Sequence, residues 1–435
     1  MKTAITTKVA PRPAQGRLAP QQRKYDVVLY GATGFVGRQT AAYFAKLDST
    51  PAAGAKPLRW ALAGRSKEKL QAVKAACGPG AKKAGIVVAD AQDAQALEAM
   101  ARDCRVVLST AGPFALHGSK LVAACVTHAT HYVDITGETP WVHDMIKAHH
   151  ATAQENGTRI IPFCGFDSVP SDLGSWLVAQ TMQEKYDEPC ESLKACFSLR
   201  GGVNGGTLAS MFNFMDSGKA KMLANPFLLN PASTRTPAAG AQLDPISPLY
   251  DVDFKAWLGP FFMGPINTRV VRRSAALLLP ARGSSKVYSK DFHYQEYLRF
   301  GAGPLAGAAA AVVSAAMLAG AAGMKLAPLR RLASRLAPGP GTGPSEAVMD
   351  AGSFRCELVG KSASGHIVRG LVADKGDPGN RVTTKMVCES ALALALQMDE
   401  LPGGMKFGGV LTPAVGLGAV LIERLLFAGM TFEAT

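Results

Sequence analysis

Three glycines lie between a short apolar run and a helical pattern in the stretch DVVLYGATGFVGRQTAAYFAKL, and this arrangement most constrains the fold. Residues 26–30 are rich in β-branched, leucine and aromatic side chains typical of a buried strand, whereas apolar residues recur at helical spacing from Phe35 to Leu47. A sharp turn from strand into helix leaves the first helical N–H groups unpaired, and these groups, together with the helix dipole, attract a phosphate. The stretch therefore predicts a phosphate site at the start of the helix.

Each glycine of this turn has a different expected role. Gly31 permits the tight turn, Gly34 lets a diphosphate approach the main chain, and Gly37 lets the helix lie close to the strand. The spacing GxxGxxG is a weak signal by itself, because glycine-rich turns also serve plain packing. The residues of this turn that we expect to contact a dinucleotide cofactor are Gly31, Thr33, Gly34, Phe35, Val36 and Gly37.

The next apolar run, from Leu58 to Gly64, predicts a second strand that ends where the adenosine ribose lies in a dinucleotide-binding unit. An acidic residue there would accept a hydrogen bond from the 2′-hydroxyl of NAD. The chain instead has Arg65 and Ser66, and a guanidinium beside a hydroxyl suits a 2′-phosphate through charge-assisted hydrogen bonds. This favours NADP, with NAD as the second choice. A solvated arginine at a helix start is the structural alternative.

Strand and helix patterns continue to alternate as far as residue 167. Further strands are expected at 83–90, 104–114, 131–138 and 159–167. Six alternating units predict an α/β fold with a Rossmann-type doubly wound parallel sheet, in which ligands bind at the carboxyl ends of the strands. At those ends we expect further cofactor contacts from Asp90, Thr110, Ala111, Gly112, Pro113 and Phe114.

Polar side chains in and after the fifth and sixth predicted strands are candidates for catalysis. Tyr132, Asp134 and Asp167 are the residues that we expect to act on a substrate. For Asp134 and Asp167 a helix cap or a satisfied turn residue is an alternative supported at least as well as catalysis. The stretch DSVPSDLG in particular offers Asp167, Ser168 and Ser171 as capping oxygens.

From about residue 189 the alternation stops, which predicts a second α+β domain with a mixed or antiparallel sheet. Residues 354–374 predict a β-hairpin, and residues 383–398 a helix packed on it. Strands are also expected at 266–272 and 286–297, after a polar, proline-rich loop at 230–248. The predicted organisation is a disordered basic tail at 1–24, the cofactor-binding domain at 25–188, a substrate or dimerisation domain at 189–410, and a C-terminal helix at 411–435 that could pack back on the cofactor-binding domain.

The segment from Gly301 to Met324 contains no charged residue and is followed by Lys325, Arg330, Arg331 and Arg335. As a helix it would be long enough to cross a bilayer, but alanine and glycine contribute little transfer free energy. Three interpretations stay open: a membrane contact, a buried or dimer-interface helix, and a flexible apolar insertion. At a membrane, the basic cluster would favour the anionic cytoplasmic side.

The formal charge of +14 does not by itself indicate a nucleic-acid partner. The basic residues gather in the tail and after residue 324 without interleaved aromatic side chains, so we expect no nucleic-acid binding. Eight cysteines without a CxxC pair or metal-ligand spacing indicate a reduced, cytoplasmic protein without a structural metal. The expected localisation is cytoplasmic, with peripheral membrane contact if segment 301–324 binds lipid.

Short motifs spread over the chain from about residue 25 to its end are specific as a set. They are GATGFVGR at 31–38, ALAGRS at 61–66, AGPF at 111–114, YVDITGE at 132–138, FCGFDSVPSDLG at 163–174, GGTLAS at 205–210, GPSE at 343–346, GDPGN at 376–380 and LTPAVGLGAVLIERLLFAGMTFE at 411–433. The set resembles the saccharopine dehydrogenase-like oxidoreductases, most closely the trans-acting enoyl reductases. The resemblance implies an NAD(P)-dependent enzyme that reduces a carbon–carbon double bond in an acyl or lipid-like substrate held by a synthase.

Two related activities are disfavoured by the residues themselves. Short-chain dehydrogenases use the tyrosine of a YxxxK pair, and none of the nine tyrosines has a lysine four residues later. Saccharopine reduction requires several cations for the substrate carboxylates, whereas the second domain offers a long apolar segment.

Reduction of an enoyl group requires hydride delivery to one carbon and protonation of the other. Tyr132, Asp134, Glu138 and Asp167 are the nearest polar candidates for the proton donor. The contrasting hypothesis is a non-catalytic scaffold that binds NADP and docks on a synthase or membrane, because no catalytic pair is recognisable.

Overall fold

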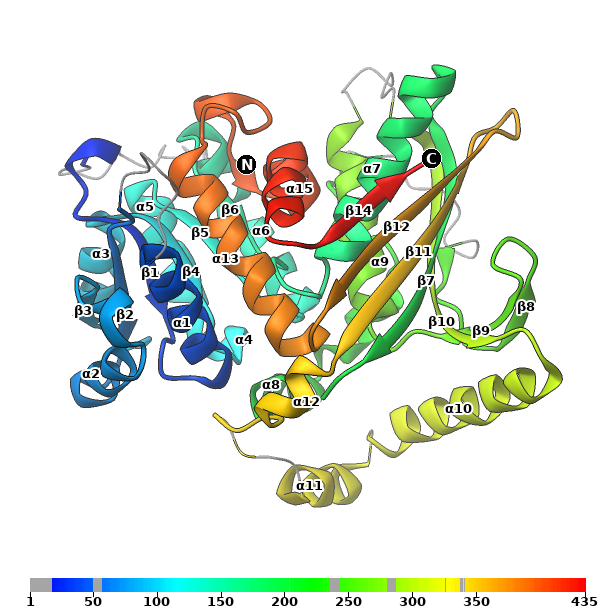
Figure 1. Ribbon diagram of the computed structural model, residues 1–435, viewed down its shortest axis with the longest axis horizontal. Coiled ribbons are helices and arrows are strands. Elements are labelled where there is room, and N and C mark those ends of the chain that lie inside the picture. Colours follow the sequence, from blue (N-terminus) through cyan, green and yellow to red (C-terminus); the bar gives the residue numbers. More distant parts are fainter. Residues whose placement is uncertain are drawn as a thin grey trace, which may run out of the picture.

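Two sheets lie side by side in the computed structural model, with helices packed on the first sheet and between the two (Figure 1). The structure describes residues 18–49, 57–202, 204–232, 234, 242–279, 287–324, 326–336, 339 and 341–435.

The first sheet is parallel and has seven strands. In chain order they are β1 (Tyr25–Tyr30), β2 (Trp60–Gly64), β3 (Gly85–Val88), β4 (Cys104–Ser109), β5 (His131–Asp134), β6 (Arg159–Ile161) and β13 (Gly409–Val410). Their order across the sheet is β13-β6-β5-β4-β1-β2-β3, and every neighbouring pair is parallel. The predicted doubly wound sheet is confirmed.

Helices cover both faces of this sheet, as the alternation predicts. The helices between its strands are α1 (Phe35–Ser49), α2 (Lys67–Ala76), α3 (Ala94–Arg102), α4 (Phe114–His117), α5 (Ser119–His128) and α6 (Thr139–Glu155). A short 3₁₀ turn, Gly78–Ala81, follows α2. Helix α7 (Val169–Tyr186) leads from this sheet to the second one, against which it packs.

The second sheet is mixed. Its strands are β7 (Cys190–Arg200), β8 (Leu249–Asp251), β9 (Ala256–Pro260), β10 (Tyr288–Gly301), β11 (Ser353–Lys361), β12 (Ile367–Lys375) and β14 (Thr431–Ala434), in the order β14-β12-β11-β7-β10-β9-β8. Strands β7 and β10 are parallel, and the other pairs are antiparallel. The hairpin predicted at 354–374 is confirmed as β11 and β12, and the strand predicted at 286–297 as β10.

The remaining helices belong to the second half of the chain. They are α8 (Gly205–Asp216), α9 (Gly264–Leu278), α10 (Pro304–Gly323), α11 (Ala327–Leu336), α12 (Glu346–Asp350), α13 (Thr383–Leu396), α14 (Pro413–Gly416) and α15 (Gly418–Phe427). Short helical turns occur at Pro20–Gln22, Lys219–Ala224, Pro378–Val382 and Gly404–Lys406. Part of the loop predicted at 230–248 lies outside the described residues.

The strand predicted at 266–272 is wrong, because these residues lie within α9. The β-branched residues of the segment suggested a strand, but α9 has three arginines at helical spacing, two of them in the segment and the third directly after it. Arg269 donates to the carbonyl oxygen of Leu223, and Arg272 to that of Pro226 at 3.2 Å. These hydrogen bonds stabilise the helix, but the local sequence does not predict them.

Helix α13 does not pack on the β11–β12 hairpin, contrary to the prediction. It lies on the parallel sheet against β1, β4 and β5, beside α1, and α7 covers the hairpin instead. The reason is that α13 is apolar on nearly every side: its side chains from Thr383 to Ala395 are almost all buried. A helix of this kind requires partners all round, and the sheet, α1 and α15 provide them.

The predicted boundary at residue 410 also differs from the arrangement of the elements. Strand β13 pairs with β6 at the edge of the first sheet. Residues 411–435 contain β14 as well as helices, and β14 pairs with β12 in the second sheet. The end of the chain therefore joins both sheets, and α15 packs on α13.

The basic tail predicted at 1–24 is partly ordered where the structure describes it, and its first 17 residues lie outside the described part. Arg23 is 3% exposed. Its guanidinium donates to Thr130 Oγ1 at 2.6 Å and to the carbonyl oxygen of His128 at 2.7 Å. This arginine therefore belongs to the core, although the prediction placed it in a disordered tail.

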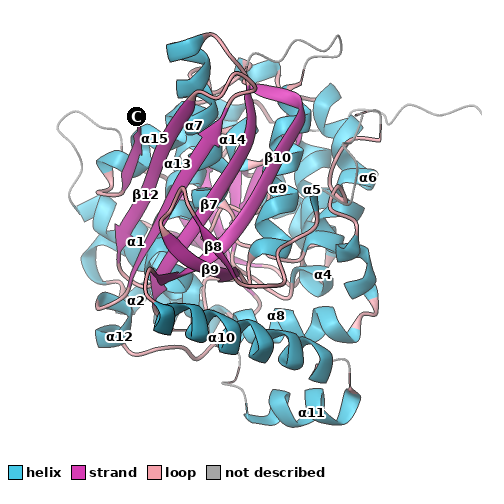
Figure 2. Ribbon diagram, turned by 90° about the vertical axis from the view of Figure 1, so that its right-hand side faces the viewer, coloured by secondary structure: helices cyan, strands magenta, loops and turns pink. Residues whose placement is uncertain are grey.

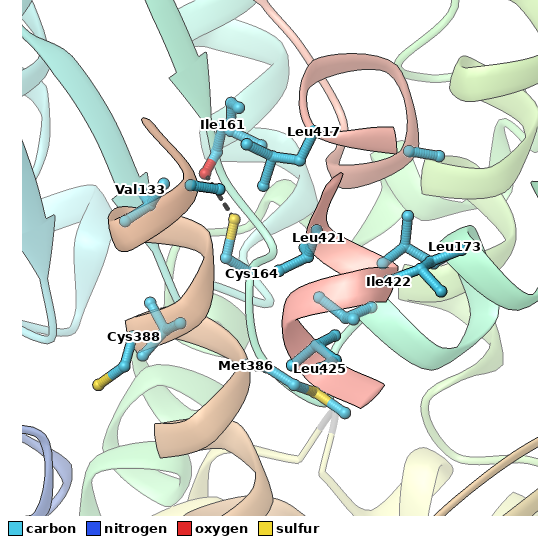
Figure 3. Close-up of a cluster of buried hydrophobic side chains, with 14 of the residues drawn as sticks. Val133, Ile161, Cys164, Leu173, Met386, Cys388, Leu417, Leu421, Ile422 and Leu425 are labelled. Carbon is cyan, nitrogen blue, oxygen red and sulfur yellow. Dashed lines mark hydrogen bonds between the residues drawn. The ribbon is translucent and has the colours of Figure 1, made fainter. Parts of the chain in front are cut away.

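A continuous apolar core joins the two sheets (Figure 3). The figure shows Val133 and Ile161 of the parallel sheet facing Leu417 and Leu421, with Met386 of α13 on the same cluster. The Cys164 thiol donates to the carbonyl oxygen of Ile161 at 3.3 Å in this cluster. The burial of these apolar side chains stabilises one arrangement of the two sheets.

The uncharged segment 301–324 forms a helix, α10, but this helix is not buried in the fold. Only Ala310 and Ser314 of this helix are buried, and it packs by one side on β9 and β10. Figure 2 shows α10 along one edge of the mixed sheet, with α11 beyond it. By length and composition, α10 is the one helix among the described residues that could cross a membrane.

Candidate active site

The loops that follow β1 and β4 meet at the point where the strand order of the parallel sheet reverses. Strands β2 and β3 lie on one side of β1, and β4, β5 and β6 on the other. Gly31, with φ of +87°, leaves so little room that a Cβ on it would lie 2.8 Å from the Ala111 nitrogen. Ligands of doubly wound sheets bind at such a crevice.

The turn between β1 and α1 presents unpaired donors. Within the described residues, the N–H groups of residues 33 and 35–37 have no hydrogen-bond partner. A Cβ on Gly37 would collide with the Gly31 carbonyl oxygen and lie 2.9 Å from the Ala32 Cα, so only glycine lets α1 lie this close to β1. These features fit a diphosphate at the start of α1.

Arg65 follows β2 as an exposed side chain that makes no hydrogen bond or ion pair within the described part of the chain. Its charge and that of Asp90 both act on the buried Tyr30 hydroxyl, whose pKa rises to about 12, mainly through burial. Arg65 and Asp90 thus both lie near the Tyr30 hydroxyl, at the end of β1. Asp90 accepts a hydrogen bond from the Gln92 N–H at 2.8 Å.

Ser66 is the N-cap of α2: its hydroxyl oxygen accepts from the Lys69 N–H at 3.2 Å and donates to Glu68 at 2.9 Å. The cap role accounts for its position without a ligand. Arg65 is the residue of the pair that is free to bind an anion.

The segment that covers the first turn of α1 was not among the predicted contacts. Arg38 donates to the carbonyl oxygens of Thr33 and Gly341, at 2.8 Å and 3.0 Å, and its guanidinium lies 5.9 Å from the centre of the Phe35 ring. A Cβ on Gly343 would lie 2.5 Å from that ring. The motif GPSE at 343–346 was the sequence signal for this segment. It packs against the turn between β1 and α1.

The loop after β4 is held by hydrogen bonds, and part of it is exposed. The Thr110 hydroxyl donates to the Gly31 carbonyl oxygen at 3.1 Å. The Glu138 carboxylate accepts from the N–H groups of Phe114 at 2.7 Å and Ala115 at 2.9 Å, so it caps α4. Gly112 is exposed, and a Cβ on it would lie 3.2 Å from the Ser210 hydroxyl of α8. The Ala111–Phe114 loop and α8 therefore face each other.

Tyr132 and Asp134 are fully buried and paired with each other. The Tyr132 hydroxyl donates to the Asp134 carboxylate at 2.9 Å, and Asp134 also accepts from the N–H groups of Thr136 at 3.0 Å and Phe163 at 3.3 Å. Burial is the main cause that raises the pKa of Asp134 to about 7. This geometry favours the turn-residue interpretation over catalysis for Asp134, and it gives the Tyr132 hydroxyl a structural partner.

Asp167 differs from these two residues because it is only partly buried and makes no hydrogen bond or ion pair within the described residues. Its Oδ2 lies 3.1 Å from where a Cβ on Gly137 would be. Burial, followed by the charge of Glu296, raises the pKa of Asp167 to about 7. The capping alternative is wrong for this stretch, since the Ser168 hydroxyl makes no cap bond to α7.

The described residues contain no group of three or more His, Cys, Asp or Glu side chains close enough to hold a metal ion. The eight cysteines are all free thiols.

The chain matches known proteins over nearly its whole length. The family "Saccharopine dehydrogenase NADP binding domain" matches residues 27–161. The chain is 36% identical over 436 residues to a trans-acting enoyl reductase of Mycobacterium bovis, which covers 96% of this chain and 99% of the relative. A trans-acting enoyl reductase of Mycobacterium leprae is 36% identical over 435 residues, with the same coverage. The apo saccharopine dehydrogenase (L-Glu forming) of Saccharomyces cerevisiae gives a TM-score of 0.48 at 12% identity, covering 94% of this chain and 99% of that one.

Proposed function

The chain belongs to the trans-acting enoyl reductase family, and from this premise we propose that it reduces a carbon–carbon double bond of an acyl or lipid-like substrate with NADPH. It is an NADP-dependent oxidoreductase by its NADP-binding domain and its relatives. The observation that carries the proposal is the set of unpaired N–H groups at the start of α1, with a free arginine at the end of the next strand.

The residues present fit NADP part by part. The N–H groups of residues 33 and 35–37 would hold the diphosphate, and Arg65 would hold the 2′-phosphate through forked hydrogen bonds. Asp90 would lie beside the adenosine end, and the loop from Thr110 to Phe114 would line the nicotinamide half. When bound, the cofactor supplies the hydride.

The substrate would lie between the loop after β4 and helix α8. Phe214 of α8 is one helical turn from Ser210 and shares its face. This half-buried aromatic side chain, with the partly buried Ala111, suits an acyl chain better than a charged amino acid. We further propose that the acyl group arrives on a separate carrier, which the word "trans-acting" in the relatives' names supports.

Consumption of NADPH in the presence of an enoyl thioester tests the proposal. We expect purified protein to oxidise NADPH when trans-2-dodecenoyl-coenzyme A is added and to leave it unchanged with the saturated dodecanoyl thioester. Binding of NADPH without consumption across short-chain, long-chain and carrier-bound enoyl thioesters would contradict an enzymatic role and would favour the NADP-binding scaffold.

We also propose that α10 and α11 rest on a membrane surface. Leu305 is 86% exposed, Val312 69% and Leu318 50%, although their helix carries no charge. Helix α11 follows with exposed Leu332 and the exposed cations Arg331 and Arg335, which suit an anionic lipid surface. Figure 1 shows both helices at the lower edge of the molecule, with α10 beside the mixed sheet and α11 beyond it.

Replacing both Leu305 and Val312 by aspartate should reduce the fraction of protein that floats with anionic phosphatidylglycerol vesicles by about tenfold or more. Burial of each apolar side chain contributes about 1.5–3 kcal/mol, and tenfold corresponds to about 1.4 kcal/mol. Phe427→Asp is the matched control, because Phe427 is 95% exposed on α15, and it should float as the wild type does. Equal flotation of all three proteins, or a stable dimer that the aspartates dissociate, would contradict a lipid contact.

A further inference from the structure

Helix α8 forms one side of the proposed acyl site, but core packing contributes little to its position. Of its 12 residues, all of them described, only Gly205 is buried. The rest of the helix is half-buried or exposed, and its neighbours are α11 and the turn Lys219–Ala224. The contacts at the start of α8 therefore decide where Ser210 and Phe214 lie.

Two segments from later in the chain hold the start of α8. The first is 341–344, which also covers the first turn of α1. The Gly205 N–H donates to the Thr342 carbonyl oxygen at 3.0 Å. A Cβ on Gly202 would lie 2.9 Å from the Pro344 Cβ. The start of α8 is thus joined to the segment that packs on the cofactor turn.

The second segment is the turn that follows β12. Its Asp377 is fully buried and accepts from the Gly202 N–H. A Cβ on Gly201 would collide with the Asp377 carboxylate, so the two segments approach each other closely. Thr383, at the end of the same turn, accepts from the Phe166 N–H of the loop after β6 at 3.0 Å. The turn therefore lies between the loop before α8 and the loop after β6.

A chain of buried hydrogen bonds runs from Asp377 to the first turn of α8. The Asn380 Nδ2 donates to Asp377 Oδ1 at 2.6 Å, and the Asn204 Nδ2 donates to Asn380 Oδ1 at 2.7 Å. Asn204 is the N-cap of α8, because its Oδ1 accepts from the Thr207 N–H at 2.9 Å. Asp377 thus holds the cap of α8 through two side-chain amides.

Main-chain donors at both ends of this chain decide which residue types it requires. The Thr207 N–H uses the Asn204 oxygen, so the Asn204 nitrogen must donate to Asn380. The Asn380 oxygen is then occupied, and its nitrogen must donate to residue 377. The Gly202 N–H donates to the other oxygen of the same residue. Position 377 needs two acceptor oxygens, which a carboxylate offers and an amide does not.

We propose that Asp377 is a positioning residue for the acyl substrate, because its two oxygens fix Asn380 and Asn204 and thereby the face of α8 that carries Ser210 and Phe214. This inference rests on the proposed function. Ser210 lies six residues after the cap, roughly 9 Å along the helix axis. A shift at the start of the helix is therefore carried to the acyl site. Asp377 acts through α8 and not on the reacting atoms.

Variants that exchange the two side chains test this role. Asp377→Asn should raise the KM for trans-2-dodecenoyl-coenzyme A about 10- to 100-fold, the effect of a misplacement of about 1 Å, and leave NADPH affinity unchanged. Its amide places a donor against another buried donor. Asn380→Asp should also raise the KM, because two carboxylates then face each other.

The double variant Asp377→Asn/Asn380→Asp should restore the KM to near the wild-type value. The carboxylate at position 380 then accepts from the amide at 377 and from Asn204, while the amide oxygen at 377 accepts from the Gly202 N–H. A role in stability alone predicts a lower urea midpoint for each single variant and a wild-type KM in the protein that is folded.

Asp251→Asn is the matched control. Asp251 is 6% exposed and accepts from the N–H groups of Asp253 at 2.9 Å and Phe254 at 3.2 Å. It thus also holds a loop from a buried position, but it lies on β8, the edge strand of the mixed sheet. The control should lower the urea midpoint and leave the KM unchanged.

Hydrogen exchange of the α8 amides gives a readout that needs no substrate. These amides should exchange faster in Asp377→Asn than in the wild type and return to the wild-type rate in the double variant. A wild-type KM for folded Asp377→Asn, or a double variant that is no better than the single ones, overturns the proposal. Failure of the wild type to oxidise NADPH with any enoyl thioester would instead overturn the proposed function, while the exchange rates would still show whether Asp377 holds α8.

Discussion

Gly37→Ala is expected to lower the affinity for NADPH by about 100-fold or more. The new methyl group would collide with the Gly31 carbonyl oxygen and press on Ala32, both of them main-chain groups that cannot rotate away. Helix α1 must then move from β1, which withdraws its N–H donors from the diphosphate. Hydrogen bonds to charged groups contribute about 1.5–3 kcal/mol each, so the loss of two accounts for this factor.

The measurement for this variant is a fluorescence titration with NADPH, together with a urea unfolding curve that shows the protein is folded. Gly264→Ala is the matched control, since it lies at the start of another helix and a Cβ there meets no atom within 4 Å. The control should bind NADPH as the wild type does. A folded Gly37→Ala protein with wild-type affinity would show that the diphosphate does not lie at α1.

Arg65→Ala is expected to raise the dissociation constant for NADPH about 10- to 100-fold and to leave that for NADH unchanged. NADH lacks the 2′-phosphate, so only NADPH loses the charge-assisted hydrogen bonds, which contribute about 1.5–3 kcal/mol. Arg65 has no partner among the described residues, so its removal leaves no internal group unpaired.

Lys67→Ala is the control for this second prediction, because it removes an exposed cation two residues away on α2. It should change neither dissociation constant appreciably. Equal weakening of NADPH and NADH by Arg65→Ala would show that the arginine supports the loop and does not select the phosphate. A wild-type protein that prefers NADH would contradict the role given to Arg65 altogether.

The parallel sheet was predictable because its signals are local. Each strand is a short apolar run, each helix has its own period, and the glycines between β1 and α1 fix the first turn. The order of the strands then places the residues after β1, β2, β3 and β4 at one edge. The predicted cofactor residues are therefore brought together by topology alone.

The errors arise where distant contacts decide the structure. The arginines of α9 bond to carbonyl oxygens of residues about 45 positions earlier, as with Arg272 and Pro226. Helix α13 finds its place on the first sheet, which lies far from it in sequence. Glu296 was missed for the same reason, because nothing near it in β10 indicates that its carboxyl group is buried against Asn267 of α9.

Transfer of deuterium tests the account most directly, because it follows the hydride itself. NADPH carrying deuterium at the transferable position of its nicotinamide ring is incubated with the protein and trans-2-dodecenoyl-coenzyme A, and the acyl product is analysed by mass spectrometry. The account predicts a saturated product with one deuterium at the β-carbon and a proton from water at the α-carbon. A saturated product without deuterium, or cofactor that stays reduced with every enoyl thioester, would contradict it.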